Sequence, residues 1–539
     1  MRTPCDEAVM QSARSGVPCD PKARIWILAA TILGSSMAFI DSTVVNVAMP
    51  AIQAGFHATV VDVQWVVESY GLFLAALILV GGSLGDILGR RRIFVVGVAI
   101  FAAASMGCGV ARNIDQLILA RSVQGVGAAL LVPGSLALIS TSFDEKTRGQ
   151  AIGTWSGFTA ITTAIGPVLG GWLVEHASWR WVFFINVPIA AAVVIISYWR
   201  IPESRSTVEA RVDWWGALLA TVGLGGLVNA FIESASLGWR NPLVFGSLIV
   251  GLICIVAFIF VEANVAAPML PLKLFQSRSF SSANLLTLLL YAAIGIFFFM
   301  FPLNLIQVQG YSATATGGAI LPFILLMFLL SRWSGGLVAH YGARGPLILG
   351  PLIGALGFVL FALPSVGENY WKAFFPAVIV LGLGMAVTVA PLTTVVMSSV
   401  NQDHVGTASG INNAVSRVAG VLAIAVLGIV MVKAFGFRLD NTLAHLPLPP
   451  DSLQMLHADE IKLAGLQVPT GLDPDLKIAV KNAIGEAFVF GFRAVMLICA
   501  ALSVAGAAVT WFMIPKNSEP QNQPRAFRSG HDSGPTRKC

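Results

Sequence analysis

The stretch Gly82-Ser83-Leu84-Gly85-Asp86-Ile87-Leu88-Gly89-Arg90-Arg91 separates two long apolar runs, and a degenerate copy of it occurs later in the chain. The copy reads Gly335-Gly336-Leu337-Val338-Ala339-His340-Tyr341-Gly342-Ala343-Arg344, in which Gly, Leu, Gly and the last Arg coincide. A second pair of segments agrees at nearly the same offset, because Gly149, Ala151 and Gly153 match Gly406, Ala408 and Gly410. The repeat predicts two parallel halves of about six helices each.

The composition places this repeat in a membrane. The 539 residues are 56% hydrophobic and only 11% charged, whereas soluble domains are about 25% charged. This excludes a soluble multidomain enzyme, which needs a more charged surface, and a disordered chain, which needs low hydrophobicity. The six cysteines form no CxxC pair and the histidines fall at helix ends or in loops, so no metal site is predicted. We expect an all-α polytopic membrane protein.

About fourteen apolar runs are long enough to cross a bilayer, which takes about 20 residues each. Their approximate bounds are 26–50, 64–84, 93–111, 115–139, 150–173, 181–199, 214–233, 242–262, 282–306, 314–332, 346–364, 374–397, 407–432 and 488–514. Two of these spans, 214–233 and 242–262, fall between the repeated halves, and their low polarity predicts a peripheral position.

The charged loops predict the orientation. Lys and Arg gather in alternate short loops, namely at Arg90 to Arg92, Lys146 and Arg148, Arg200, Arg205 and Arg211, Lys273 and Arg278, and Arg332 and Arg344. The intervening short loops carry only Arg112, Arg180, Arg240 and Lys372. By the positive-inside rule both termini are cytoplasmic, and the net charge of +6 reflects these loops and not nucleic-acid binding.

The spans and loops predict five segments along the chain. They are a cytoplasmic tail (1–24), a six-helix half (25–200), a two-helix insertion with its linkers (201–280), a second six-helix half (281–514) and a cytoplasmic tail (515–539). Within the second half, 433–487 is the one long outward segment, where Asp473 before Pro474 is typical of a helix start. It is either an extracytoplasmic cap or a tolerated loop.

Five motifs in order make the chain resemble the major facilitator superfamily, specifically the fourteen-span drug:proton antiporters of the EmrB/QacA type. They lie at 39–50 in the first span, 82–92 in the loop after the second, 119–127 in the fourth, 166–171 in the fifth and 178–188 before the sixth. The resemblance implies a major facilitator fold of two six-helix halves plus two extra transmembrane helices.

The resemblance also implies a function. We expect a proton-coupled multidrug efflux antiporter of the bacterial inner membrane, which exports hydrophobic or cationic toxic compounds by alternating access. The alternative is a specific metabolite exporter or a symporter on the same fold. No catalytic constellation and no phosphate-binding loop is visible, so the protein is expected not to be an enzyme and to need no cofactor beyond a proton gradient. Expected partners are drug-like small molecules, protons and the lipid bilayer, with a periplasmic adaptor in some members of the group.

Three charged residues are candidates for coupling protons to substrate. Asp41 lies about 15 Å below the outer surface and Arg121 about 10 Å, by a rise of about 1.5 Å per residue. A buried carboxyl there must pair with a cation, face a cavity or carry a proton. The two residues therefore form either an exchange site or a fixed structural ion pair. Glu68, only about four residues into the second predicted span, is either a third coupling residue or a solvated rim residue.

Other polar and small residues have predicted roles. The expected substrate cavity is lined by Asn46, Gln124, Asn304 and Gln307. The expected conformational gate comprises Gly82, Asp86, Gly89, Arg90 and Arg91, in which Asp86 anchors the turn or meets a helix N-terminus of the other half. The expected antiporter motif comprises Gly166, Pro167, Gly170 and Gly171, where proline kinks the span and glycine allows close helix packing.

Overall fold

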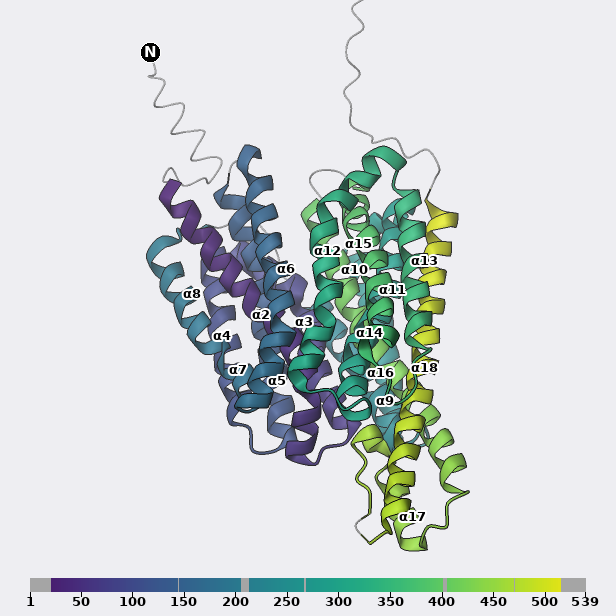
Figure 1. Ribbon diagram of the computed structural model, residues 1–539. Helices are drawn as coiled ribbons and strands as arrows, with labels where there is room; N and C mark the ends of the chain where they lie inside the picture. Colours follow the sequence, from purple (N-terminus) through teal and green to yellow (C-terminus); the bar gives the residue numbers. More distant parts are fainter. Residues whose placement is uncertain are drawn as a thin grey trace, which may run out of the picture.

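A computed structural model describes residues 21–143, 145–204, 213–265, 268–400, 405–469 and 471–514. Figure 1 shows a bundle of long, roughly parallel helices, and the described residues contain no strand. Thirteen described helices are long and apolar enough to cross a membrane. The remaining predicted span, 150–173, falls within a 32-residue helix, so all fourteen predicted spans lie on long helices. The predicted all-α polytopic fold is confirmed.

The first half contains six long helices, the last of which is preceded by a short helical turn. Its elements are α2 (Pro21–Phe56), α3 (Val60–Leu88), α4 (Arg90–Val110), α5 (Ile114–Ser142), α6 (Glu145–His176), α7 (Trp181–Phe184) and α8 (Asn186–Arg200). The inserted pair follows as α9 (Trp214–Leu237) and α10 (Pro242–Asn264), and a 3-10 helix, η1 (Leu272–Gln276), leads into the second half.

The second half also contains six long helices. Its elements are α11 (Arg278–Leu303), the π-helix η2 (Asn304–Val308), α12 (Ala313–Tyr341), α13 (Arg344–Phe361), α14 (Tyr370–Ala373), α15 (Phe375–Ser398), α16 (Val405–Leu443), α17 (Pro450–Ala458), the 3-10 helix η4 (Glu460–Gly465) and α18 (Pro474–Met513).

Local sequence explains where many of these helices begin and end. Thr59 and Asp62 form a capping box at the start of α3, which satisfies backbone N–H groups that the first turn leaves free. Gly89 separates α3 from α4 with a φ of +116°, a conformation that side chains with a Cβ rarely adopt. Asn113 and Ser277 cap α5 and α11 in the same way through their side chains.

Two helices of the second half extend well beyond a bilayer. α16 has 39 residues and α18 has 40, so each is about 60 Å long, whereas the hydrocarbon core is about 30 Å thick. Their extensions and α17 form a helical projection at the bottom of Figure 1, which we call the cap (residues 433–487). α18 starts at Pro474, with Asp473 as its N-cap residue, as predicted. The start of α2 and the end of α18 lie on the opposite side, which we call the terminal side.

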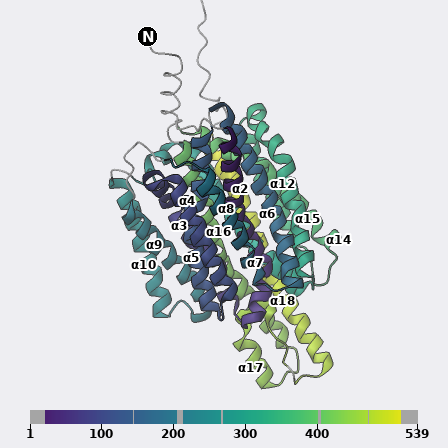
Figure 2. The ribbon, with the colours of Figure 1, turned by 90° about the vertical axis from the view of Figure 1, so that its left-hand side faces the viewer.

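The inserted pair is not wholly peripheral, contrary to the sequence-based expectation. α9 packs on α3 of the first half and on α16 of the second. Val61, Val228 and Val421 share one apolar cluster there, and the Nε1 of Trp65 donates a hydrogen bond to Glu233 at 2.8 Å. α10 packs on α9 and is mostly exposed, at one edge of the bundle in Figure 2. The insertion therefore covers the line where α3 meets α16.

Candidate functional site

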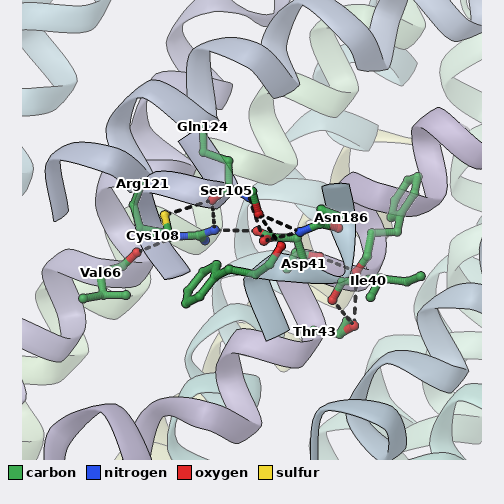
Figure 3. A network of polar contacts seen from close by, with 12 residues as sticks. Ile40, Asp41, Thr43, Val66, Ser105, Cys108, Arg121, Gln124 and Asn186 are labelled. Atoms are coloured by element: carbon green, nitrogen blue, oxygen red, sulfur yellow. Dashed lines mark hydrogen bonds and ion pairs between the residues drawn. The ribbon is translucent and has the colours of Figure 1, made fainter. Parts of the chain in front are cut away.

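A buried ion pair lies at the centre of the first half. Arg121 of α5 donates through Nη1 to Asp41 of α2, and the two side chains are 1% and 0% exposed. Figure 3 shows the pair facing each other between the helices. The structure therefore places the two residues in direct contact as an ion pair. A buried pair of this kind is held by its mutual attraction, because each charge alone in the interior would be strongly unfavourable.

Neutral polar side chains complete the coordination of Asp41. Gln124 donates to the carboxylate at 2.8 Å and accepts from Arg121 at 2.7 Å. Asn186, at the start of α8, donates to Asp41 at 3.4 Å and to Ser105 at 3.0 Å. Gln124, which follows Arg121 by one turn, therefore belongs to this network. The roles of Asn186 and Ser105 were not predicted, because the sequence does not show which distant residue a single amide or hydroxyl in an apolar run will bond.

Backbone and ring contacts fix the guanidinium of Arg121. Its Nε donates to the carbonyl oxygen of Val66 at 3.1 Å, and its Cζ lies 4.2 Å from the centroid of the Tyr70 ring, a cation–π contact. Both partners come from α3, so the network joins α2, α3, α4, α5 and α8. All of these helices belong to the first half, so the network lies wholly within that half.

The interpretation of Glu68 as a solvated rim residue is wrong. α3 begins at Val60, before the predicted span, so Glu68 lies more than two turns inside the helix and is 1% exposed. Neither carboxyl oxygen has a hydrogen-bond partner in the described part of the chain. On the same face of α3, Gln64 donates to the Ile424 carbonyl of α16 and Gly71 packs against Val421. Glu68 therefore lies at the contact between the two halves.

The predicted gate residues form contacts within the first half. Arg90 makes a salt bridge to Asp86 at 2.7 Å, and the backbone N–H of Arg91 donates to Glu203 at 3.1 Å. The carboxylate of Glu203 also packs directly on Gly89, where a Cβ would lie 2.6 Å from its oxygen. Asp86 thus anchors its own turn, the first of the two predicted roles. Glu203 was missed because it lies far along the chain, after α8. Gly82 is half-buried on α3 and faces Pro133 of α5.

The glycines of the fifth span let α6 pack closely on two neighbours. A Cβ at Gly166 would lie 2.1 Å from the Thr43 hydroxyl, and one at Gly170 would lie 2.9 Å from Val44, both on α2. A Cβ at Gly171 would lie 2.3 Å from the Ala313 carbonyl oxygen of α12, in the other half. The backbone of Pro167 meets Gly317 of α12 in the same way. Figure 1 shows α6 and α12 converging toward the cap side, where these contacts lie.

The remaining predicted cavity residues lie apart from Asp41. Asn46 is half-buried on α2, and Asn304 is 2% exposed in the π-helix η2. Gln307, also in η2, donates to Gln53 of α2 at 2.7 Å, and Gln53 donates to the Lys462 carbonyl of the cap at 3.2 Å. A cavity of about 90 Å³ adjoins these amides. Gln307 thus lies at the cap-side contact between the halves, whereas Asn304 accepts a hydrogen bond from Gln309 within the second half.

The fold and this site define a class of protein. Two six-helix halves meet along α3–α16 and α6–α12, and a charged network is buried within one half. This is the architecture of secondary transporters built from parallel repeats. The sequence model of the Major Facilitator Superfamily matches residues 31–424. The chain belongs to the major facilitator superfamily, a family of transporters.

Curated relatives match almost the whole chain. The "Multidrug resistance protein Stp" of Mycobacterium tuberculosis is 32% identical over 506 residues, which cover 92% of this chain and 93% of the relative. The "Tetracenomycin C resistance and export protein" of Streptomyces glaucescens is 30% identical and covers 94% of this chain and 96% of its own. A bacterial homologue of the lysosomal transporter Spinster, solved in an inward-facing conformation, shares the fold with a TM-score of 0.63 at 18% identity, covering 91% and 98% of the two chains.

Proposed function

We propose that the protein exports hydrophobic or cationic toxic compounds in exchange for protons, by alternating access. The relatives support export of toxic compounds, since their names record drug resistance and, in one case, export. The observation that carries the proton coupling is the presence of two carboxyl groups inside the spans of the first half, Asp41 and Glu68, at 0% and 1% exposure. Ionisable residues inside a membrane are costly and are typical of proton pathways.

The two carboxyl groups have different roles in this proposal. Asp41 accepts hydrogen bonds from Arg121, Gln124 and Asn186, and this network joins the helices of the first half. Glu68 has no such partner in the described part of the chain and faces the other half. A carboxyl at this position can carry a proton while the contact between the halves is closed. It can release the proton when the halves separate and water reaches it from one side of the membrane. We assign the exchanged proton to Glu68 and the integrity of the moving half to Asp41 and Arg121.

The contacts between halves suggest how access alternates. Gly171 with Ala313, and Gln53 with Gln307 and the cap, join the halves on the cap side. We propose that the cap side faces outward and the terminal side faces the cytoplasm of a bacterial inner membrane, in agreement with the loop charges. Opening outward then requires these cap-side contacts to separate, while α3 and α16 rotate past each other.

Everted membrane vesicles test the exchange. In energised vesicles we expect an exported hydrophobic dye to enter the lumen and release protons from it. Glu68→Gln should lower gradient-driven transport by about tenfold or more while exchange of labelled for unlabelled dye persists, because exchange needs no net proton movement. Asp115→Asn, at an exposed helix start, is the matched control.

Several results would contradict the proposal. If Glu68→Gln transports as well as the wild type, the proton assignment is wrong. If protons enter the lumen together with substrate in these vesicles, the protein is a symporter. If a panel of toxic compounds is ignored and a single cellular metabolite is exported, the protein is a specific exporter on the same fold.

A further inference from the structure

A second cation lies inside the spans and takes no part in the network around Asp41. Arg417 is on α16, three turns from the helix start, and is half-buried. Within the described part of the chain it makes no hydrogen bond and no ion pair. Arg121, in contrast, donates hydrogen bonds to a carboxylate, a side-chain amide and a backbone carbonyl. An unpaired guanidinium at this depth is costly in a bilayer and marks a functional site by default.

The neighbours of Arg417 place it between the two halves. Gly410 and Val421, on the same side of α16, pack against Leu79 and Gly71 of α3. Arg417 is close enough to interact electrostatically with the phenol groups of Tyr70 on α3 and Tyr291 on α11. Arg417 therefore lies on the face of α16 that meets α3 of the first half.

The charges around this position leave Arg417 uncompensated. Asp41 and Arg121 neutralise each other inside the first half. In the second half, the segments 278–361 and 405–432 contain no Asp or Glu. The amide of Asn412, one turn before Arg417, is already bonded to Asn284 and Thr287 of α11. The remaining buried carboxyl on α3, Glu68, lies further toward the cap side, and within the described residues it makes no hydrogen bond to Arg417.

We propose that Arg417 is the anchor for an acidic group of the transported compound, so that the preferred cargo is a hydrophobic anion. This rests on the proposed export function, keeps its hydrophobic compounds and replaces its cationic compounds by anions. A guanidinium offers two parallel donors that match a carboxylate, sulfonate or phosphonate group. The phenols of Tyr70 and Tyr291 add hydrogen bonds, and the apolar side chains of the helices accept the rest of the molecule. A cation at this position is repelled by Arg417.

A site that spans both halves also suits alternating access. Tyr70 moves with the first half, whereas Arg417 and Tyr291 move with the second. A compound bound between them contacts both moving bodies and can respond to their relative rotation. Binding energy can then differ between the two facing states, which is the condition for a ligand to shift their populations.

Three pyrene probes that differ only in their head group test the proposal. Pyrenebutanesulfonate is a permanent anion, pyrenebutanol is neutral and pyrenebutyltrimethylammonium is a permanent cation. We would measure their binding to the purified full-length protein by fluorescence and their gradient-driven uptake into proteoliposomes. The variants are Arg417→Gln, Arg417→Lys and the control Arg438→Gln, whose side chain lies in the exposed cap.

The proposal expects wild-type protein to bind the sulfonate more tightly than the cation. Arg417→Gln should weaken sulfonate binding by about tenfold or more and leave the alcohol within about twofold, and Arg417→Lys should be intermediate, since it keeps the charge and loses the paired donors. The Arg438→Gln control should match the wild type. Thermal melting of each variant monitors folding, and retained binding of the alcohol shows that the site is intact.

Two results would overturn the inference. One is preferential binding of the cation by the wild type, and the other is equal weakening of all three probes by Arg417→Gln. Its failure is distinguishable from failure of the proposed function. Uptake of the cation driven by a proton gradient, without Arg417-dependent sulfonate binding, refutes the inference alone. Arg417-dependent sulfonate binding without gradient-driven uptake refutes the proton-coupled function alone.

Discussion

Arg91 and Arg344 perform the same task in the two halves of the protein. Arg91 donates through Nη1 to the carbonyl oxygen of Ile201, directly after α8, at 2.9 Å. Arg344 donates through Nη2 to the carbonyl oxygen of Trp511, in the last turn of α18, at 2.7 Å. Each arginine lies at the start of the third long helix of its half and holds the end of the sixth. The last Arg of the repeated segment is thus a helix-end clamp in both halves.

The first prediction concerns this clamp. Arg344→Gln removes a charge-assisted hydrogen bond and the stacking of the guanidinium on Trp511, whose ring centroid lies 4.6 Å away. We expect the loss of about 1 kcal/mol of stability, because such bonds contribute about 1.5–3 kcal/mol when well buried and this one is partly exposed. A lowered melting temperature of the detergent-solubilised protein is the readout. Arg438→Gln, which removes an exposed pair, should change it little.

The second prediction concerns the pair Asp41–Arg121. Arg121→Gln leaves a buried carboxylate without its cation, and we expect a loss of about 3–5 kcal/mol of stability. The double variant Asp41→Asn with Arg121→Gln removes both charges and should recover most of that loss, since amides can keep a neutral network. Thermal melting of the two variants compares them. A double variant as unstable as Arg121→Gln would argue that the charge pair itself holds the helices.

The third prediction compares two glycines near the cap-side seam. Gly171→Ala places a methyl group 2.3 Å from the Ala313 carbonyl oxygen, whereas Gly318→Ala meets nothing within 4 Å. We expect Gly171→Ala to separate α6 from α12 on the cap side and to lower transport by about tenfold or more. Increased labelling of a cysteine introduced at the cap-side end of α12 measures the separation. Equal behaviour of both variants would contradict a sealing role for the glycine.

The fourth prediction is a pH dependence of the cap. Burial and the nearby Asp440 raise the pKa of the Glu460 carboxyl above its usual value, and the neighbouring His457, paired with Asp440 at 2.9 Å, opposes this in part. The folded cap therefore favours protonated Glu460. Its contribution to stability is fully present below the unfolded pKa and is lost as the pH rises through the raised pKa.

Glu460→Gln tests this sign. The variant should melt higher than the wild type at about pH 8 and similarly at about pH 4, because only at the higher pH does the wild type carry the unfavourable charge. Glu486→Gln, which alters an exposed pair of the cap, is the control. A wild type that melts higher than the variant at the alkaline pH would show that the carboxylate is favourably paired there.

The fold could be predicted because its determinants are local. Apolar runs of fixed length, punctuated by Gly89 and by caps such as Thr59 and Asn113, set the spans, and a repeated Gly-Leu-Gly-Arg pattern sets the two halves. The predicted ends of the helices were less accurate. α16 and α18 continue past the bilayer because the residues after the apolar run still favour helix, and hydropathy alone does not register them.

The site could be predicted in part, for a similar reason. Asp41 and Arg121 are charges at matching depth in apolar helices, so their pairing followed from position. Their amide partner Asn186 and the gate partner Glu203 depend on how helices far apart in the chain are arranged, which no spacing records. The depth of Glu68 was misjudged because the polar residues before it, Asp62 and Gln64, concealed the true start of α3.

The position of α9 has a consequence for solutes dissolved in the lipid. This helix lies over the line where α3 and α16 meet, so it walls off that flank of the carrier. The opposite flank, between α6 and α12, carries no such cover from the insertion. A hydrophobic solute that diffuses laterally from the membrane core therefore meets two different flanks. On one flank α9 covers the contact between the halves, and on the other the contact consists of closely packed small residues.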